Sequence, residues 1–210
     1  PEDVIYDNGD TVKGAGADIS DKSFSITDFT VDDSKAVEIS AEELKALLID
    51  KKALTGEEVF IVNEPIVLDS NTKYYGNFAQ VIAKGGIVIK DTEEIVIKEL
   101  VVKGNVTVEN SKGITFFKLG VVAEGIGLDV DADSYDIAVK TCRIIATETA
   151  FNCSASLITC SLNYFSAPTG IVTDGDDFAI INSQISAINA GIVSSGKYAS
   201  IRNCTVTCAQ

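Results

Sequence analysis

The chain of 210 residues contains no histidine, no methionine and no tryptophan, and its only arginines are Arg143 and Arg202. Histidine is the commonest general base and metal ligand near neutral pH, so its absence excludes the many sites that depend on it. Acidic residues outnumber basic residues by 31 to 17. The formal net charge of −14 argues against nucleic acid as a partner, because phosphate contacts need lysine and arginine. No apolar run approaches the roughly 18 residues of a membrane-spanning helix, so no membrane span is expected.

The second half of the chain repeats itself about every 20 residues. The segment 170–185 (GIVTDGDDFAIINSQI) is matched one repeat later by the segment 191–206 (GIVSSGKYASIRNCTV). Such a period indicates a solenoid, in which each repeat is one coil and stacked coils bury a continuous core. From Gly85 onward about six rungs can be aligned, each with two or three short β-branched strands separated by Gly, Asn, Asp and Ser turns.

Three parts are predicted. Residues 1–35 form a polar arm with nine acidic residues against three lysines, in which only 24–31 alternates like a strand. Residues 36–84 hold a capping helix and the first coil, and residues 85–210 hold the parallel β-helix rungs.

A short helix is predicted over residues 41–52. Ser40 and Glu43 have the spacing of a capping box, and Leu44, Leu47 and Leu48 follow at helical spacing.

The order of helix, strand 59–62 (VFIV), strand-like segment 65–76 (PIVLDSNTKYYG) and later rungs resembles the pectate-lyase-like right-handed parallel β-helix superfamily. The resemblance covers residues 37–207. It implies an all-β, right-handed parallel β-helix of about six rungs whose amphipathic N-terminal helix caps the first coil. Function does not follow from the fold alone, because one fold hosts many chemistries.

The enzymes of that superfamily use either an acidic calcium site with an Arg or Lys base, or paired Asp with His and Lys. The segment 173–177 (TDGDD) is similar to the Asp-Gly-x-Asp signature of the hydrolases, but the chain has no His. The repeat 170–190 also lacks Lys and Arg. We therefore interpret 173–177 as a Gly- and Asp-rich turn and expect no enzymatic activity.

The cysteines are Cys142, Cys153, Cys160, Cys204 and Cys208. Alignment of the rungs places Cys142, Cys160 and Cys204 in one column, with Ser183 in the fourth repeat. Two interpretations are open: buried small residues packed in the core, or disulfides, some of them between molecules. Because the number is odd, at least one thiol lacks an internal partner, and Cys208 near the end of the last rung is the candidate for an intermolecular bond. Without Cys-x-x-Cys or His, a zinc site is not expected.

An acidic column also emerges from the alignment. It contains, one per rung, Lys90, Glu109, Asp131, Ser154, Asp174 and Ser195, and the next turn positions add Asp91, Asp133 and Asp176. Ca²⁺ takes six to eight oxygen ligands, so Asp131, Asp133, Asp174 and Asp176 are candidate calcium ligands. The alternative is a solvated charged edge that keeps the protein soluble. No other cofactor is expected.

Asn105 and Asn152 stand in the Asn-x-Ser/Thr pattern and are candidate glycosylation sites. A third match, Asn203, aligns with Asn182 and is expected to be buried. The chain begins at Pro1 without Met, which we interpret as a processed and exported product that is extracellular or lies at the cell surface.

Two functions compete. The first is an extracellular structural protein that self-assembles into a sheath, coat or filament through its arm and its uncapped β-helix end, with itself as partner. The alternative is a carbohydrate-binding or polysaccharide lyase- or hydrolase-like module, with cell-surface carbohydrate as partner. The lack of an acid–base constellation and of a capping helix after the last rung favours the first.

Overall fold

The computed structural model describes residues 33–51 and 53–208. The chain divides into two units, Pro1–Asp32 and Asp33–Gln210. The predicted arm, except for its last three residues, and the strand pattern at 24–31 therefore lie outside the described residues. The second unit begins with the short 3-10 helix η2 (Asp33–Lys35) and strand β1 (Val37–Glu38).

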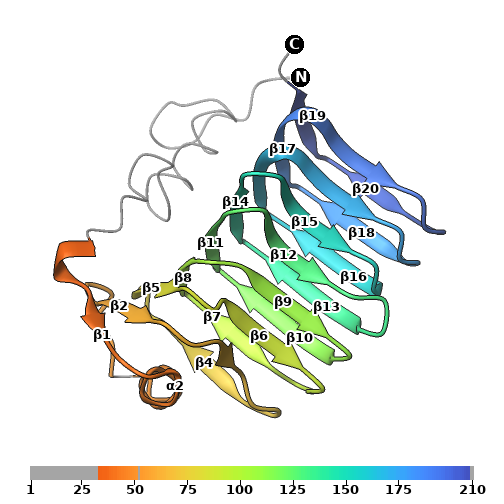
Figure 1. Ribbon diagram of the computed structural model, residues 1–210. Coiled ribbons are helices and arrows are strands. Elements are labelled where there is room, and N and C mark those ends of the chain that lie inside the picture. The colour runs from red at the N-terminus through yellow and green to blue at the C-terminus, as the bar shows by residue number, and fades with distance from the viewer. Residues whose placement is uncertain (1–32, 52, 209–210) are drawn as a thin grey trace, which may run out of the picture. The chain divides into compact units, whose positions relative to one another are not determined.

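The helix α2 (Ala41–Ile49) is the predicted one, and it ends three residues earlier than expected. The capping box is present: the Glu43 backbone N donates to Ser40 Oγ at 3.2 Å, and the Ser40 backbone N donates to Glu43 Oε2 at 2.9 Å. The hydrogen bonds that the Ser40 backbone N and Ser40 Oγ donate to Glu43 Oε2 hold the pKa of the Glu43 carboxyl below its usual value. Leu44 and Leu48 are fully buried and pack against the first coil, so α2 covers this end of the solenoid (Figure 1).

After α2 the chain winds into a parallel β-solenoid of about eight turns, which confirms the predicted all-β fold. Each coil contributes one strand to each of three faces, and equivalent strands stack in parallel (Figure 1). The first face contains β2 (Val59–Val62), β5 (Gln80–Ala83), β8 (Val101–Lys103), β11 (Gly120–Ala123), β14 (Arg143–Ala146), the first parts of β17 (Tyr164–Thr173) and β19 (Gln184–Ser194), and β21 (Thr205–Cys208). The second face contains β3 (Ile66–Val67), β6 (Ile87–Lys90), β9 (Val106–Glu109), β12 (Ile126–Val130), β15 (Thr149–Cys153) and the second parts of β17 and β19. The third face contains β4 (Lys73–Tyr75), β7 (Val96–Lys98), β10 (Lys112–Phe117), β13 (Tyr135–Lys140), β16 (Ser156–Ser161), β18 (Phe178–Ile181) and β20 (Ser200–Arg202).

The number of turns exceeds the predicted six because the coils start earlier than Gly85. Val59 already pairs with Gln80, and Gln80 pairs with Val101, so the strands before residue 84 are full members of the stack. The coils also differ in length. Gly120 pairs with Val101 of the preceding coil and with Arg143 of the following coil, so the second of these two coils is the longer. The extra residues are accommodated at the corners, because the strands stay in register along each face. Strands β17 and β19 shift register between Ala167 and Thr169, which is also a corner.

The core is built from columns of equivalent residues, one from each coil. On the third face one column runs through seven coils and is buried in all but the last: Tyr74, Ile97, Phe116, Val139, Cys160, Ile180 and Ile201. At the corner between the first and second faces a second column holds only small residues: Ala83, Gly104, Ala123, Ala146, Ala167, Ala187 and Cys208. Neighbouring backbone approaches this corner so closely that a Cβ on Gly104 would collide with the Ala83 carbonyl oxygen.

The corner between the third and first faces uses a left-handed backbone residue in six successive coils. These residues have φ between 49° and 56°: Glu99, Lys118, Thr141, Leu162, Asn182 and Asn203. A residue in the left-handed conformation bends the chain sharply at the end of a strand. For residues other than Gly or Asn this conformation is unfavourable by about 1 kcal/mol. The stacked strands on both sides of each corner therefore offset the cost of its left-handed residue.

Candidate functional site

The corner between the second and third faces carries the predicted acidic column. Lys90 pairs with Glu109 in the strand register, and Lys90 Nζ lies 2.7 Å from Glu109 Oε2, which raises the pKa of Lys90. Asp131, Ser154, Asp174 and Ser195 continue the column, since each backbone N donates to a carbonyl of the preceding coil at 2.9–3.3 Å. The predicted alignment is confirmed. We call Asp91, Asp131, Asp133, Asp174 and Asp176 the acidic edge.

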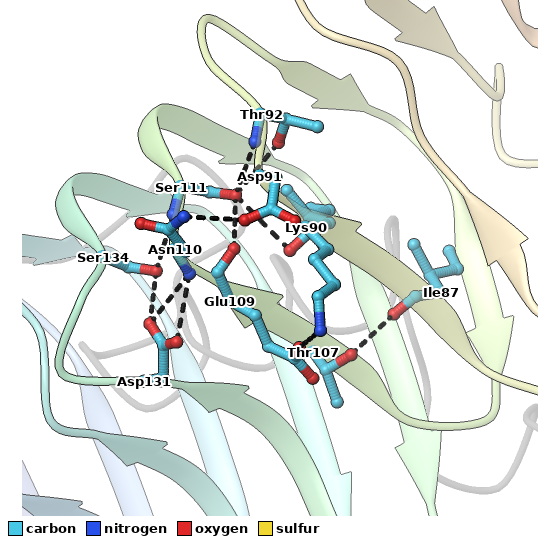
Figure 2. Close-up of polar contacts among 11 residues, drawn as sticks. Ile87, Lys90, Asp91, Thr92, Thr107, Glu109, Asn110, Ser111, Asp131 and Ser134 are labelled. Atoms are coloured by element: carbon cyan, nitrogen blue, oxygen red, sulfur yellow. Dashed lines mark hydrogen bonds and ion pairs between the residues drawn. The ribbon is translucent and has the colours of Figure 1, made fainter.

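Hydrogen bonds between coils orient the first part of this edge (Figure 2). The Asn110 backbone N donates to both carboxylate oxygens of Asp131, at 3.2 and 3.0 Å, and Asn110 Nδ2 donates to Asp91 Oδ1 at 2.7 Å. Asp91 and Asn110 both have positive φ, at 53° and 44°, a conformation that these residue types tolerate. Asn110 thus links three successive coils through its backbone and its side chain.

A ladder of hydroxyls lies directly beneath these carboxylates. The Thr92 backbone N donates to Ser111 Oγ, and the Ser111 backbone N donates to Ser134 Oγ, both at 3.1 Å. Ser134 Oγ then donates to Asp131 Oδ1 at 2.6 Å. Ser111 and Ser134 are buried, so these bonds satisfy polar groups that would otherwise destabilise the fold.

A polar groove of about 430 Å³ lies beside the ladder. Lys112 Nζ pairs with Glu93 Oε2 at 2.8 Å in this groove, which raises the pKa of Lys112, and the Tyr135 side chain is 46% exposed. The groove is lined by Ser70, Asp91, Thr92, Glu93, Asn110, Ser111, Lys112, Asp133 and Tyr135. An exposed ring beside amide, hydroxyl and carboxylate groups can stack against and hydrogen-bond a polar ligand.

The four candidate calcium ligands do not gather into one cluster. Asp131 and Asp174 are two coils apart, with Ser154 between them in the register. Asp176 Oδ1 accepts from the Lys197 backbone N at 2.8 Å, whereas Asp133 is exposed. Across residues 33–51 and 53–208, no group of three or more acidic, Cys or His side chains is placed to hold a metal. Calcium binding by Asp131, Asp133, Asp174 or Asp176 stays a prediction.

The segment 173–177 consists of the last residue of β17 and the turn that leads to β18, as expected from its Gly and Asp content. Gly175 is buried there, and a Cβ at this position would collide with the carbonyl oxygen of Ala155 in the preceding coil. The close approach of the neighbouring coil therefore explains why the TDGDD segment has a glycine at this position.

The cysteines are all free thiols. Cys142, Ser183 and Cys204 do share a column, with Asn163 between the first two, but the placement of Cys160 in it was wrong. Cys160 pairs with Val139 and Ile180 inside the third face. Both Cys142 and Cys160 follow a threonine, yet Thr141 is a left-handed corner residue and Thr159 lies in a strand, so the local likeness is accidental.

Three thiols are held away from solvent. Burial raises the pKa of Cys142 and of Cys153 to about 12 and that of Cys160 well above its usual value. Since the thiolate is the reactive form, these three are unreactive in the folded protein. Cys208 is exposed at the end of β21, so it is the most accessible of the five.

The glycosylation candidates differ in accessibility. Asn105 is exposed in the corner between β8 and β9, whereas Asn152 is half-buried and its Nδ2 donates to Asp129 Oδ1 at 2.7 Å. Asn203 does align with Asn182, but both are exposed, so the expectation that Asn203 is buried was wrong. The shared role of these two asparagines is the left-handed corner.

The sequence reasoning missed a second surface column, on the outer side of the third face. It consists of Tyr75, Lys98, Phe117 and Lys140, which are direct partners in successive coils. Lys98 Nζ lies 5.8 Å from the Tyr75 ring centroid and 5.9 Å from that of Phe117, within the range of cation–π attraction. We call it the lysine–aromatic column. Its signal in the sequence is the alternation of Lys and aromatic residues at the coil spacing.

Neither lysine of this column is neutralised. Among the ion pairs within 4.0 Å in the described part of the chain, Lys98 and Lys140 have no carboxylate partner. Lys118, beside the column, does pair with Glu99 at 3.1 Å.

The described residues include no helix long and apolar enough to cross a membrane. No protein-family model matches the chain, and no curated protein matches its sequence. The fold is a parallel β-solenoid, and a fold alone does not identify a function.

Proposed function

We propose that this protein is an extracellular structural protein whose copies associate through the open strand edges of the last coil, as part of a coat, sheath or filament. The observation that supports this proposal is the state of that coil. Within the described residues β20 pairs only with β18, and β21 pairs only with β19. A row of unpaired backbone N–H and C=O groups is a template for a strand from another chain.

Apolar side chains on the same coil point to the same conclusion. Ile201 is 50% exposed, Val206 is 46% exposed and Tyr198 is 79% exposed. Ile180 and Ile185, the equivalents of Ile201 and Val206 one coil earlier, are fully buried, because another coil lies over them. A further layer would bury the exposed group in the same way, and burial of apolar area favours association.

The two ends of the solenoid differ in what they could offer as this layer. Within the described residues the first coil is covered by α2, and its first face is extended by β1, a strand of only two residues, so this end offers a much shorter open edge than the last coil. The matching edge is the last coil of a second copy. Such a contact uses the same surface on both partners and is therefore two-fold symmetric, with the strands of the two edges antiparallel.

The association is tested by light scattering coupled to gel filtration, with the full chain over a range of concentrations. We expect the parent to form a dimer or larger species, and Val206→Lys to lower the associated fraction at least ten-fold. Val67→Lys is the matched control, because Val67 is 49% exposed on β3 near the opposite end. A parent that stays monomeric at every concentration sinks the proposal, as does equal association of the two variants.

The extracellular part of the proposal has a separate test. Asn105 is an exposed sequon, so passage through a glycosylating secretory pathway would add a glycan there. Secretion of the chain from eukaryotic cells should give a mass increase that is removed by an N-glycosidase and lost in Asn105→Gln. A protein that stays inside intact cells contradicts the location.

The polar groove favours a second candidate function, carbohydrate binding. Tyr135 offers an exposed ring beside the Lys112–Glu93 pair and the Asn110 side chain. A glycan array with parent protein and Tyr135→Ala tests it. Tyr198→Ala serves as the control, since Tyr198 is exposed but does not line the groove. Loss of a glycan signal in Tyr135→Ala alone supports this function, and no signal for the parent removes it.

A further inference from the structure

The third face has edges of opposite charge. At the corner where its strands begin, Asp133 and Asp174 are exposed, and Asp131 and Asp176 accept hydrogen bonds from backbone N–H groups. None of these four carboxylates pairs with a lysine or arginine within 4.0 Å in the part of the chain that is described. This corner of the third face therefore carries an unbalanced negative charge.

The other end of the same strands carries the lysine–aromatic column. Lys98 is the last residue of β7 and Lys140 the last of β13, and both follow buried residues, so their side chains lie on the outer surface. Lys73 at the start of β4 adds a further exposed lysine to this face. In a protein with a net charge of −14, two lysines of one column that lack carboxylate partners among the described residues mark a surface that fits an anionic partner.

The two columns share one repeat distance. Lys98 and Lys140 are two coils apart, with Phe117 between them, and Asp131 and Asp174 are two coils apart, with Ser154 between them. Stacked strands are separated by about 4.8 Å, so each pair spans about 10 Å along the solenoid. Two parallel solenoids side by side, offset by two coils along their axes, would thus bring Lys98 and Lys140 opposite Asp131 and Asp174 at the same time.

We propose that copies of this solenoid pack side by side, with the acidic edge of one copy against the lysine–aromatic column of the next. The inference rests on the proposed self-association and names a second contact for it. The contact joins different surfaces of the two copies, so each added copy presents a new acidic edge or a new lysine–aromatic column. Repetition of the contact extends the assembly laterally, whereas the two-fold contact of the last coil joins only two solenoids.

Salt should affect this lateral contact in two directions. At low ionic strength the net charge of each copy repels its neighbour over long distances, since the Debye length is about 30 Å at 0.01 M. At about 0.15 M this repulsion is screened while opposed charges a few ångströms apart still attract. At about 1 M the attraction is also screened. Lateral assembly should therefore be greatest at intermediate salt, whereas apolar edge pairing does not weaken at high salt.

The decisive experiment is charge exchange, measured by sedimentation velocity of the full chain between about 0.01 and 1 M NaCl, the range over which screening changes most. Lys98→Glu/Lys140→Glu and Asp131→Lys/Asp174→Lys should each lose lateral assembly alone. An equimolar mixture of the two variants should recover it at least ten-fold, because each variant supplies the charge that the other lacks. Lys84→Glu is compared with the single change Lys140→Glu, since both lysines are exposed and only Lys140 belongs to the column. Circular dichroism melting verifies that each variant folds.

Asp131 also accepts hydrogen bonds within the fold, so the pair Asp133→Lys/Asp174→Lys is the second acidic variant. Assembly by the parent that is unaffected by either charge reversal overturns the lateral contact and leaves the proposed function standing. A mixture that does not assemble, when the parent does, overturns it too. A parent that is monomeric at every salt concentration overturns both.

Discussion

Within the described residues the solenoid has a closed end, covered by α2, and an open end at its last coil, and the two ends contain the same columns of residues in different surroundings. At the closed end Tyr74 is 1% exposed under α2, and at the open end Ile201 is 50% exposed, although both belong to one column of the third face. The apolar character of a position is repeated from coil to coil. Its burial depends on whether another layer lies over it, so equal side chains in one column contribute unequally to stability.

The sharpest way to test this comparison is to truncate the same side chain in two coils. Ile180→Ala removes a fully buried side chain between two stacked coils and should lower the free energy of unfolding by about 2–5 kcal/mol. Ile201→Ala, in the next coil of the column, should cost less than about 1 kcal/mol. Urea unfolding of both variants measures the difference, and equal losses would mean that Ile201 is covered in solution.

Two asparagines, one buried and one exposed, give a second comparison. Asn163 is buried: its Oδ1 accepts from the Cys142 backbone N and its Nδ2 donates to the Val139 carbonyl, both at 2.8 Å. Asn163→Ala should cost about 2–3 kcal/mol, because two buried backbone groups lose their partners. Asn182→Ala, at an exposed corner, should cost about 1 kcal/mol or less. Thermal melts compare them, and a larger loss for Asn182→Ala would contradict the assignment.

Cysteine replacements sharpen the comparison between columns. Cys160→Ser places a hydroxyl between Val139 and Ile180 and should lower the free energy of unfolding by about 1–2 kcal/mol. Cys142→Ser should cost less, because Ser183 occupies the same column and its hydroxyl donates to the Ile181 carbonyl at 3.0 Å. Chemical denaturation measures both, and the reverse order would show that the column assignment does not govern the cost.

The closed end is probed through its helix cap. Ser40→Ala removes the side-chain acceptor of the Glu43 N–H and should cost about 1 kcal/mol. Ser195→Ala, at an exposed turn of the last coil, is the control and should be neutral. If the melting temperatures of the two variants agree, the capping box does not stabilise the closed end.

The smallest effect on stability is expected from modification of Cys208. Iodoacetamide at pH 8 should label Cys208 in the folded protein without changing its melting temperature, while Cys142, Cys153 and Cys160 react only after unfolding. Their pKa values are raised by burial, to about 12 for Cys142 and Cys153. These three thiols therefore ionise at a lower pH in the unfolded chain than in the folded protein. The free energy of unfolding should consequently fall as the pH rises above about 8.5. Peptide mass spectrometry after a labelling pulse distinguishes the sites, and rapid labelling of Cys160 would contradict its burial.

Much of the fold could be predicted from local patterns. The match between residues 170–185 and 191–206 indicated stacked coils, and Ser40 with Glu43 marked the start of α2. The column from Lys90 to Ser195 was placed correctly because its turn residues follow the strand pattern of each repeat. The column of Cys160 was misplaced because the coils differ in length, and only stacking decides at which corner the extra residues lie.

The sequence by itself determined the period, the apolar strand positions and the charges at each turn, since these depend on short-range patterns of side chains. Only the tertiary structure decided that Lys98 and Lys140, which are far apart in the sequence, lie in one column with Phe117 between them. It also decided that Ile180 is buried while Ile201 is exposed. The physical reason is that hydrogen bonds between coils set both the register and the cover of each residue, and those bonds join residues that no local pattern relates.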